Sequence, residues 1–340
     1  MRMKRCSVLL IYLFLVPCIL NAELIKVVSI GSNDLNYLFF KVSGAVLDKN
    51  GNIYVLDSKG SFLRKYDAQG TFVKEIGKLG QGPGDFSNVL SGLHLDGDLY
   101  LLDAGNSRIV EIDRDLNIKN YIRIRHQARG LIKINDLFYM ISSRQGEPFS
   151  EIVIYNNKGE FKGTFFDQYP LFINSATSTK MEYALGKIYS DIALSVNKES
   201  EEVAIVFKYP GIKTALFLYS KEGQLIRKID IDNFMPYDFP GFRLKWPVNY
   251  PGRSELISIG SIHYLSEGKI LLEYWIEKYD SEKAMDQKLY LLVIDMATGN
   301  TIHKELVNSV INVMDARGNL LCAREEDGDI AKIVLYRFVY

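Results

Sequence analysis

The sequence predicts an all-β protein, a six-bladed β-propeller built from four-stranded antiparallel blades. The first observation is a unit of apolar strand, tight polar turn and second apolar strand, which is clearest at Gly44–Asp57 and returns at Gly92–Asp103. The second is that one such unit cannot bury its own apolar faces and must stack on copies of itself. The third is that the last unit lacks a strand that the N-terminal segment can supply. A closed ring of blades satisfies all three observations.

A second marker identifies the outer half of each unit. It consists of an apolar strand, a turn with a residue suited to positive φ, and another apolar strand. This marker predicts a hairpin between the two outer strands of a blade, so each unit has four strands. It occurs at residues 66–70, 112–117, 155–159, 219–223 and 294–299. We therefore expect five full blades, at about 38–77, 89–125, 128–167, 188–232 and 258–307.

The sixth blade is incomplete at the C-terminus. Residues 310–340 contain three strand-like runs and then end. The missing strand is available at the other end of the chain, as Leu24–Ile30. Closing the ring with strands from both termini would cover two open sheet edges at once. We therefore expect a single propeller domain over residues 23–340, in which trimming either end destabilises the ring.

Residues 1–22 have the layout of a secretory signal peptide. A basic start at positions 2–5 precedes the apolar run Ser7–Val16, and a small residue, Ala22, precedes the predicted cleavage point. The apolar run is too short for a comfortable membrane span. We therefore expect a periplasmic or secreted protein without a transmembrane segment in its mature chain. An uncleaved membrane anchor is the first alternative.

Lipid attachment at Cys18 is the second alternative for the N-terminal segment. The residues before Cys18 partly match a lipobox, but Pro17 stands where a small residue is expected. Strand-like sequence also begins at Leu24, which leaves almost no tether. Cys322 would be the single cysteine of the mature chain, so no intramolecular disulfide is expected, and its apolar neighbours predict a buried, inert thiol.

Composition excludes some classes of partner. The formal net charge is zero, 47% of the residues are hydrophobic and 24% are charged, which is ordinary for a globular protein. Since no block of like charge is present, nothing indicates binding to nucleic acid or to an anionic membrane. We expect a monomer and no cofactor.

Two segments carry a resemblance to a known kind of propeller. Asp103–Asp113 resembles the NHL repeat, and Gly77–Phe86 resembles a loop of bacterial six-bladed propellers of the NHL and TolB-like kind. The resemblance is strong over residues 40–125 and faint over 128–340. It implies the fold and leaves the function open, because such propellers include binding proteins, scaffolds, lyases and hydrolases.

Loop lengths favour one face of the predicted ring. The blade-to-blade connections 77–89, 168–187 and 233–257 are long, and so is the expected loop at 277–287, which would open on the same face. The loops on the other face are minimal. Long loops in a compact domain are usually functional or disordered. We therefore expect the ligand or partner to bind on the long-loop face.

The insertion at 233–253 is the richest of these segments in aromatic and basic residues. Such side chains suit a protein, peptide or carbohydrate ligand. The alternative is that the insertion covers the ring as a lid and packs its own aromatics. The candidate binding residues are Tyr237, Phe239, Phe242, Arg243, Lys245, Trp246 and Arg253, together with Arg129 and Asp191 at the channel mouth.

His94 and His263 are the candidate metal ligands. They occupy corresponding first strands of blades two and five, which face each other across a six-fold ring, so a shared metal in the channel is conceivable. Both lie within apolar strands, however, and packing between blades is the preferred interpretation. Asp191 is the one acidic residue near the start of a predicted inner strand, and a single carboxylate makes a poor site for a hard dication.

Motifs for other chemistry are missing from the sequence. No Gly-x-Ser-x-Gly motif is present, and the glycine-rich run Gly77–Gly84 lacks the Lys and Ser or Thr of a phosphate loop, so it predicts a turn between blades. The preferred interpretation is an exported, non-catalytic binding or scaffold propeller. The alternatives are a metal-dependent lyase or hydrolase acting at the channel mouth, and a structural subunit of a cell-envelope complex.

Overall fold

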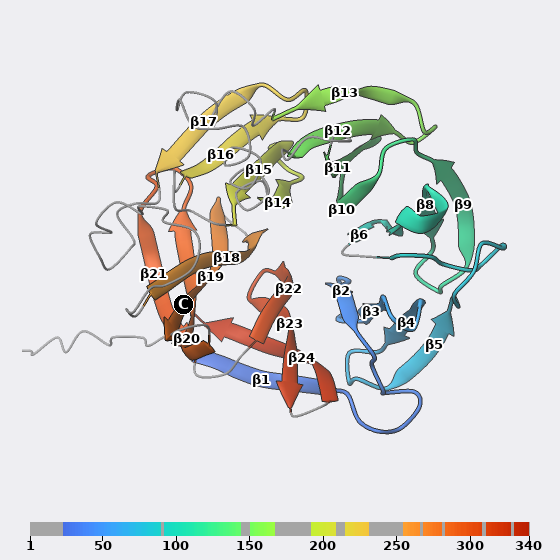
Figure 1. The fold of residues 1–340 in the computed structure, drawn as a ribbon, viewed down its shortest axis with the longest axis horizontal. Helices are drawn as coiled ribbons and strands as arrows, with labels where there is room; N and C mark the ends of the chain where they lie inside the picture. The colour runs from blue at the N-terminus through green and yellow to red at the C-terminus, as the bar shows by residue number, and fades with distance from the viewer. Residues whose placement is uncertain are drawn as a thin grey trace, which may run out of the picture.

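Six four-stranded antiparallel sheets stand side by side around a central axis (Figure 1). The structure is a computed structural model that describes residues 23–89, 92–143, 150–166, 192–208, 215–230, 254–265, 268–280, 283–307, 311–327 and 330–339. The ring confirms the predicted six-bladed propeller. The predicted signal peptide at 1–22 lies outside the described residues.

The first three blades follow one another along the chain, each with its first strand nearest the axis. Their strands are β2 (Val42–Leu47), β3 (Ile53–Asp57), β4 (Phe62–Tyr66) and β5 (Phe72–Ile76) in blade one; β6 (Leu93–Asp96), β7 (Asp98–Asp103), β8 (Arg108–Ile112) and β9 (Ile118–Arg123) in blade two; and β10 (Ala128–Ile134), β11 (Leu137–Ser143), β12 (Ser150–Asn156) and β13 (Phe161–Phe165) in blade three. A single 3-10 turn, η1 (Ala104–Asn106), follows β7.

The next two blades have the same strand order. Their strands are β14 (Ile192–Asn197), β15 (Glu202–Phe207), β16 (Ala215–Ser220) and β17 (Leu225–Asp230) in blade four, and β18 (Ser254–Tyr264), β19 (Lys269–Asp280), β20 (Lys283–Asp295) and β21 (Thr301–Val307) in blade five. Within the described part of the chain, no helix has the length and hydropathy of a membrane span.

Blade six is built from both ends of the chain. It combines β22 (Ile311–Arg317), β23 (Leu320–Asp327) and β24 (Ile330–Val339) with β1 (Glu23–Ile30), in the order β1-β24-β23-β22. The register runs from Glu23 opposite Val339 to Ile30 opposite Ile333, with one irregularity between Lys26 and Val28. The predicted closure by the N-terminal strand is therefore confirmed.

The core consists of six apolar clusters within the described residues, and each cluster spans two neighbouring blades. In the cluster between blades six and one, for example, Ile30, Cys322 and Ile333 pack against Val42 and Ile53. The face of a blade is thus buried only by the next blade, as the repeat requires. Cys322 is fully buried, as predicted.

The outer hairpins turn where the sequence marker places them. In each case a side-chain oxygen at the start of the turn accepts hydrogen bonds from the backbone N–H groups two or more residues later, which fixes the turn locally. The residues that supply this oxygen are Asp67, Asp113, Asn156, Ser220 and Asp295.

The glycine-rich connection after β5 is a compact backbone turn. Phe86 N–H donates to the carbonyl of Lys78, and Gly80 N–H donates to the carbonyl of Phe86. The Phe86 ring is fully buried in the core between blades one and two. The connection therefore packs between blades, in agreement with the interpretation of Gly77–Gly84 as a turn.

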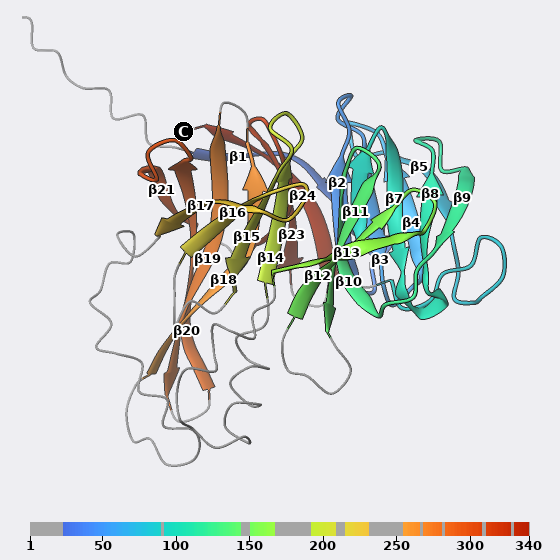
Figure 2. The same ribbon diagram turned by 90° about the horizontal axis from the view of Figure 1, so that it is seen from above.

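Blade five extends beyond the ring on one face. Strands β18, β19 and β20 are longer than those of the other blades and project from the body of the molecule (Figure 2). The expected loop at 277–287 is wrong, because pairing between β19 and β20 continues to Asp280 opposite Lys283. Each added strand pair satisfies further backbone groups, and residues 277–287 contain no Gly or Pro that would interrupt the pairing. The long connections 168–187 and 233–253 lie outside the described residues.

Candidate functional site: the central cavity

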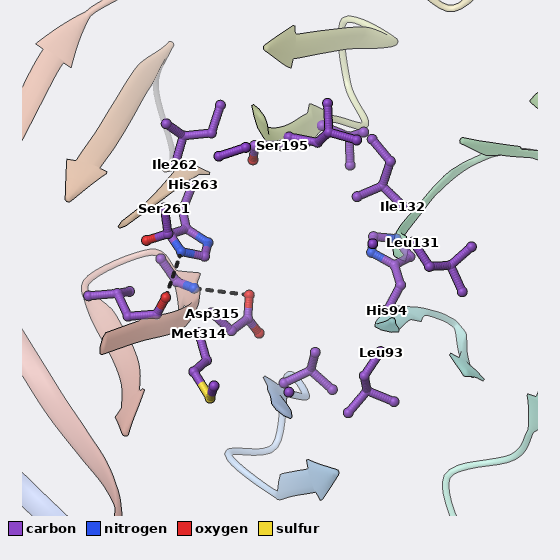
Figure 3. A pocket seen from close by; sticks show the side chains of 18 of the residues that line it. Leu93, His94, Leu131, Ile132, Ser195, Ser261, Ile262, His263, Met314 and Asp315 are labelled. Carbon is purple, nitrogen blue, oxygen red and sulfur yellow. Dashed lines mark hydrogen bonds between the residues drawn. The ribbon is translucent and has the colours of Figure 1, made fainter. Parts of the chain in front are cut away.

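The inner strands of all six blades line one cavity on the axis of the ring. Its volume is about 670 Å³. Strands β2, β6, β10, β14, β18 and β22 each contribute residues, and the view down the axis shows their side chains around an open centre (Figure 3). A volume of this size is in the usual range for a small-molecule site.

Bulges shape several of these inner strands. The pairing with the second strand of the blade shifts between Val42 and Gly44 in β2, and between Arg129 and Leu131 in β10. Equivalent shifts occur in β18 and β22. A bulge bends its strand and changes the direction of the side chains around it. Four of the six inner strands therefore have a local bend where they line the cavity.

Gly260 shows why a glycine stands at the bulge of β18. A Cβ atom at this position would lie 2.7 Å from the carboxyl group of Glu273 and 3.0 Å from Trp275 Nε1. The absence of a side chain at Gly260 therefore leaves room for the buried Glu273 directly behind the cavity wall.

Basic side chains outnumber acidic ones in the lining. Arg129, Lys198, Lys208 and Arg317 line the cavity, and Asp315 is the one carboxylate among the described lining residues. One carboxylate is a poor ligand set for a hard dication, so the described lining does not favour a divalent cation.

One end of the cavity lies on the face of the long blade-to-blade connections. Inner strands begin on this face and second strands end on it, because neighbouring strands are antiparallel. Arg129 lies near the start of β10, and Lys208 directly follows β15. A hydrogen bond of 2.6 Å from Ile259 N–H to the Lys208 carbonyl holds Lys208 beside β18.

An ion-pair network joins three neighbouring blades at the opposite end of the inner strands. Lys198, directly after β14, donates to Asp96 Oδ1 and to the Leu95 carbonyl, both at 2.9 Å, and Lys133 donates to Asp96 Oδ2 at 2.9 Å. These bonds connect blades two, three and four. Burial disfavours the charged form of Asp96, but the hydrogen bonds from Lys133 and Lys198 outweigh it and lower its pKa.

Asp315 joins blade six to blade one at the same end. Its Oδ2 accepts a hydrogen bond of 2.8 Å from Leu47 N–H, and Arg317 Nη1 donates to the Leu47 carbonyl at 3.0 Å. Burial raises the pKa of Asp315 to about 6. The Asp315 carboxyl group, the one carboxyl group of the described lining, therefore already forms a hydrogen bond between blade six and blade one.

The two histidines lie on opposite sides of the cavity (Figure 3). His263 Nε2 is 3.4 Å from the carbonyl of Val313 in blade six. Burial lowers the pKa of His263 to about 4, and burial together with the positive charge of Lys198 lowers that of His94 to about 3. Both imidazoles are thus neutral near pH 7. Among the described residues, no group of three or more His, Cys, Asp or Glu side chains is placed to hold a metal ion.

Glu273 is a buried group that the sequence analysis missed. Its carboxylate has no exposed surface and accepts hydrogen bonds from Ser261 Oγ at 2.7 Å, Trp275 Nε1 at 2.9 Å and Val313 N–H at 3.0 Å. Burial raises its pKa to about 7 against the effect of these bonds. The signal in the sequence was a single acid within the apolar run Ile270–Trp275, which forms part of the second strand of blade five.

The structure places three of the residues singled out from the sequence in this one cavity: Arg129, His94 and His263. The other predicted binding residues lie outside the described residues; these are Asp191, Tyr237, Phe239, Phe242, Arg243, Lys245, Trp246 and Arg253. The sequence analysis did not identify Lys208, Arg317 and Asp315 as site residues. They line the cavity only because the fold brings distant strands together around one axis, which the sequence does not show.

Comparison with known proteins supports the architecture. The family DUF5128, described as a 6-bladed beta-propeller, matches residues 37–123, which comprise blades one and two. No curated protein matches the sequence. The resemblance to NHL and TolB-like propellers stays a prediction.

Solved structures are similar to the chain over most of its length. A member of the DUF4221 family from Bacteroides vulgatus has a TM-score of 0.60 at 10% identity and covers 94% of this chain and 99% of its own. A candidate exported protein from Bacteroides fragilis has a TM-score of 0.55 at 12% identity, with coverage of 93% and 94%. A catalytically inactive histidine-to-alanine variant of virginiamycin B lyase from Staphylococcus aureus, solved with quinupristin, has a TM-score of 0.51 at 9% identity, with coverage of 94% and 100%. At such identities the likeness concerns the fold alone. The six blades of the structure, the family match and these relatives show that the chain is a six-bladed β-propeller.

Proposed function

We propose that this chain is an exported, non-catalytic binding protein whose ligand enters the central cavity from the face of the long blade-to-blade connections. The observation that carries the proposal is the cavity of about 670 Å³, to which the inner strands of all six blades contribute. Export is supported by the signal-peptide pattern of residues 1–22 and by the likeness to a candidate exported protein.

Two polar groups of the lining, Asp315 and His263, favour binding over catalysis. Asp315 already accepts the Leu47 N–H, and the His263 imidazole lies at the Val313 carbonyl. A general base must be able to reach a substrate proton. Groups that hold neighbouring blades together serve that role poorly, whereas a rigid wall suits recognition.

Filling the cavity tests the proposal. Ile132 and Leu194 lie in the inner strands of adjacent blades and line the cavity. We expect saturation-transfer NMR signals from a fragment library with the wild-type protein, and their loss in Ile132→Trp and Leu194→Phe. Phe161→Trp on an outer strand is the control, because Phe161 is exposed.

Two results would contradict the proposal. Fragment signals that persist in both filled variants would place binding elsewhere, and a library without any signal from the wild-type protein would favour a structural role in an envelope complex. Circular dichroism and thermal unfolding of each variant confirm that the ring is intact.

A lyase acting at the cavity is the second candidate. It is favoured by the two imidazoles in the lining and by the fold shared with virginiamycin B lyase. Incubation with quinupristin, followed by mass spectrometry, tests it. Conversion of quinupristin by the wild-type protein that His263→Ala abolishes would establish the lyase, whereas unchanged quinupristin would leave binding as the function.

A further inference from the structure

We propose that the central cavity takes a small, uncharged and mainly apolar molecule, held by contact with the apolar side chains of the inner strands. This inference rests on the proposed function of the cavity as a binding site and specifies the class of ligand. It follows from two observations. The charged side chains of the described lining already interact with other groups of the protein, and the wall between them presents half-buried apolar side chains.

Contacts between blades occupy the charged groups at the end of the cavity away from the long connections. Lys198 donates to Asp96 Oδ1 at 2.9 Å, and Arg317 Nη1 donates to the Leu47 carbonyl at 3.0 Å. Asp315, the one carboxylate of the described lining, accepts from Leu47 N–H at 2.8 Å. An ionic ligand at this end would have to compete with these contacts and give up its own hydration.

The other charged groups of the described lining are Arg129 and Lys208, and both also interact with other parts of the protein. Burial raises the pKa of Glu273 to about 7, and the positive charge of Lys208 opposes this rise, so Lys208 acts on a carboxyl group behind the wall. The two imidazoles add no charge near pH 7, because burial lowers the pKa of His263 to about 4 and that of His94 to about 3. Each charged group of the described lining thus has a partner within the protein.

The wall between the two ends is apolar and only partly covered. Leu93, Ile132, Leu194 and Met314 come from the inner strands of four blades, and each is only half-buried within the protein. Leu93, Ile132 and Met314 stand around the open centre in the view down the axis (Figure 3). A ligand that covers these side chains removes apolar surface from water, which stabilises the complex in proportion to the area buried.

Water is a weak competitor for such a wall. A water molecule in a cavity needs about two to four polar partners, and an apolar group that displaces poorly held water gains affinity. The cavity volume of about 670 Å³ is in the usual range for a drug-sized ligand. The wall therefore favours a compact apolar body over a charged one.

Three adamantane derivatives of one shape test the charge requirement. 1-Adamantanol is uncharged, adamantane-1-carboxylate is an anion and 1-adamantylammonium is a cation. We would follow their displacement of the neutral fluorescent probe N-phenyl-1-naphthylamine from the full protein. We expect the alcohol to displace the probe at concentrations at least about tenfold lower than either ion, because an ion loses hydration in the cavity without gaining a free partner. Raising the salt concentration should leave the affinity of the alcohol unchanged.

Variants of Met314 test the contribution of the wall. Met314→Gln keeps the length of the side chain and adds a polar amide, so it should weaken binding of the probe roughly tenfold. Met314→Leu is the matched apolar variant and should keep binding within about twofold. Leu225→Gln is the surface control, since Leu225 lies on the outer strand β17 and is 54% exposed. The cavity-filling variants Ile132→Trp and Leu194→Phe should abolish binding of the probe. Circular dichroism confirms that each variant is folded.

The outcomes separate this inference from the proposed function. If either ion displaces the probe as well as the alcohol does, and the filled variants lose the probe, the cavity is a binding site but the uncharged class is overturned. Equal binding to Met314→Gln and to the wild-type protein would overturn the role of the wall. If the filled variants keep the probe, the cavity itself is wrong as the site. If neither the probe nor the alcohol binds the wild-type protein, the apolar class is overturned while the fragment screen still decides the cavity.

Discussion

Asp57 and Asp103 show how single side chains position a whole connection. Asp57 ends β3, is fully buried, and accepts hydrogen bonds from the backbone N–H groups of Phe40, Lys41, Lys59 and Gly60. These four hydrogen bonds compensate for the burial of the carboxylate and fix the segment before β2 against the turn after β3.

The second blade repeats this device with side-chain donors as well as a backbone donor. Asp103 ends β7 and accepts from Ser87 N–H, Asn106 Nδ2 and Arg108 Nε, all within 2.8 Å. Arg108 in turn donates to the Asp85 carbonyl at 2.7 Å and so fixes the incoming connection. The segment that resembles an NHL repeat therefore has a structural role, because its polar residues hold the blade-to-blade loop.

Glu273 predicts a pH dependence of stability. Its pKa is about 7 in the folded protein against an ordinary value of 4.5, since burial disfavours the charge. Between these values the folded protein keeps a proton that the unfolded chain releases. The free energy of unfolding therefore falls as the pH rises from about 4.5 to about 7, by up to roughly 3 kcal/mol in total. Below pH 4.5 both states are protonated and Glu273 contributes no slope.

Replacing Glu273 by glutamine should flatten this fall in urea denaturation measured at several pH values. Asp315 has a raised pKa of about 6 and would leave a residual slope at lower pH. Glu160→Gln is the control, because hydrogen bonds from Lys162 and Asn156 lower the pKa of this exposed group. An unchanged slope in Glu273→Gln would show that Glu273 does not titrate in this range.

At the scale of elements, β1 is the strand on which ring closure depends. It alternates between a face packed on the core and a face exposed to solvent. Ile30 is 1% exposed and lies in the cluster between blades six and one, whereas Ile25 is 43% exposed. The same residue type thus occurs in both environments within eight residues.

This alternation allows a matched test. Ile30→Ala should lower the free energy of unfolding by about 2–5 kcal/mol, because it removes buried methyl groups and leaves a cavity. Ile25→Ala should cost less than about 1 kcal/mol, since its side chain is partly in water already. Equal losses in urea denaturation would mean that β1 contributes pairing without packing.

The whole molecule depends on closure because every blade face is covered by a neighbour. The six interblade clusters form a closed circuit, so among the described residues each blade packs its apolar faces on its two neighbours. We therefore expect the ring to open as one cooperative unit. Cys322 in β23 reports on this opening, since its thiol is fully buried and burial raises its pKa.

Thiol labelling tests cooperativity directly, with Cys6 and Cys18 replaced by serine. We expect Ile30→Ala in blade six and Ile109→Ala in blade two to accelerate labelling of Cys322 by the same factor per kcal/mol, about tenfold for 1.4 kcal/mol. Ile109 is fully buried and packs in the cluster between blades two and three. Acceleration confined to Ile30→Ala would show that the closing blade opens alone.

Much of the fold could be predicted from short-range signals. The turn residues Asp67, Asp113 and Asn156 fix their hairpins through bonds to backbone groups two to four residues away. The repeated apolar strands need neighbouring blades to cover their faces, and the last blade lacks a strand that the N-terminal segment can supply. These two observations together predicted a closed ring. The prediction of a loop at 277–287 was wrong because the length over which two strands stay paired depends on both strands together, and neither strand shows it alone.

The candidate site could be predicted only in part. The sequence analysis identified three lining residues, because they lie in recognisable inner strands: His94, Arg129 and His263. Lys198 and Asp96 are 102 residues apart, and Asp315 bonds Leu47 across 268 residues of chain. Bulges such as that at Gly260 also change the direction of the side chains around them. The sequence does not show where such a change occurs.

The sequence by itself determined the repeat, the turns and the need for closure, because these follow from hydrogen bonds and apolar periodicity within one blade. The tertiary structure alone decided which charged side chains line the cavity, the burial of Glu273 and the bonds that join blade six to blade one. These properties depend on which side chains from distant blades meet at the axis. These contacts are set by the register of the strands and the rotation between blades, and no local sequence pattern specifies either.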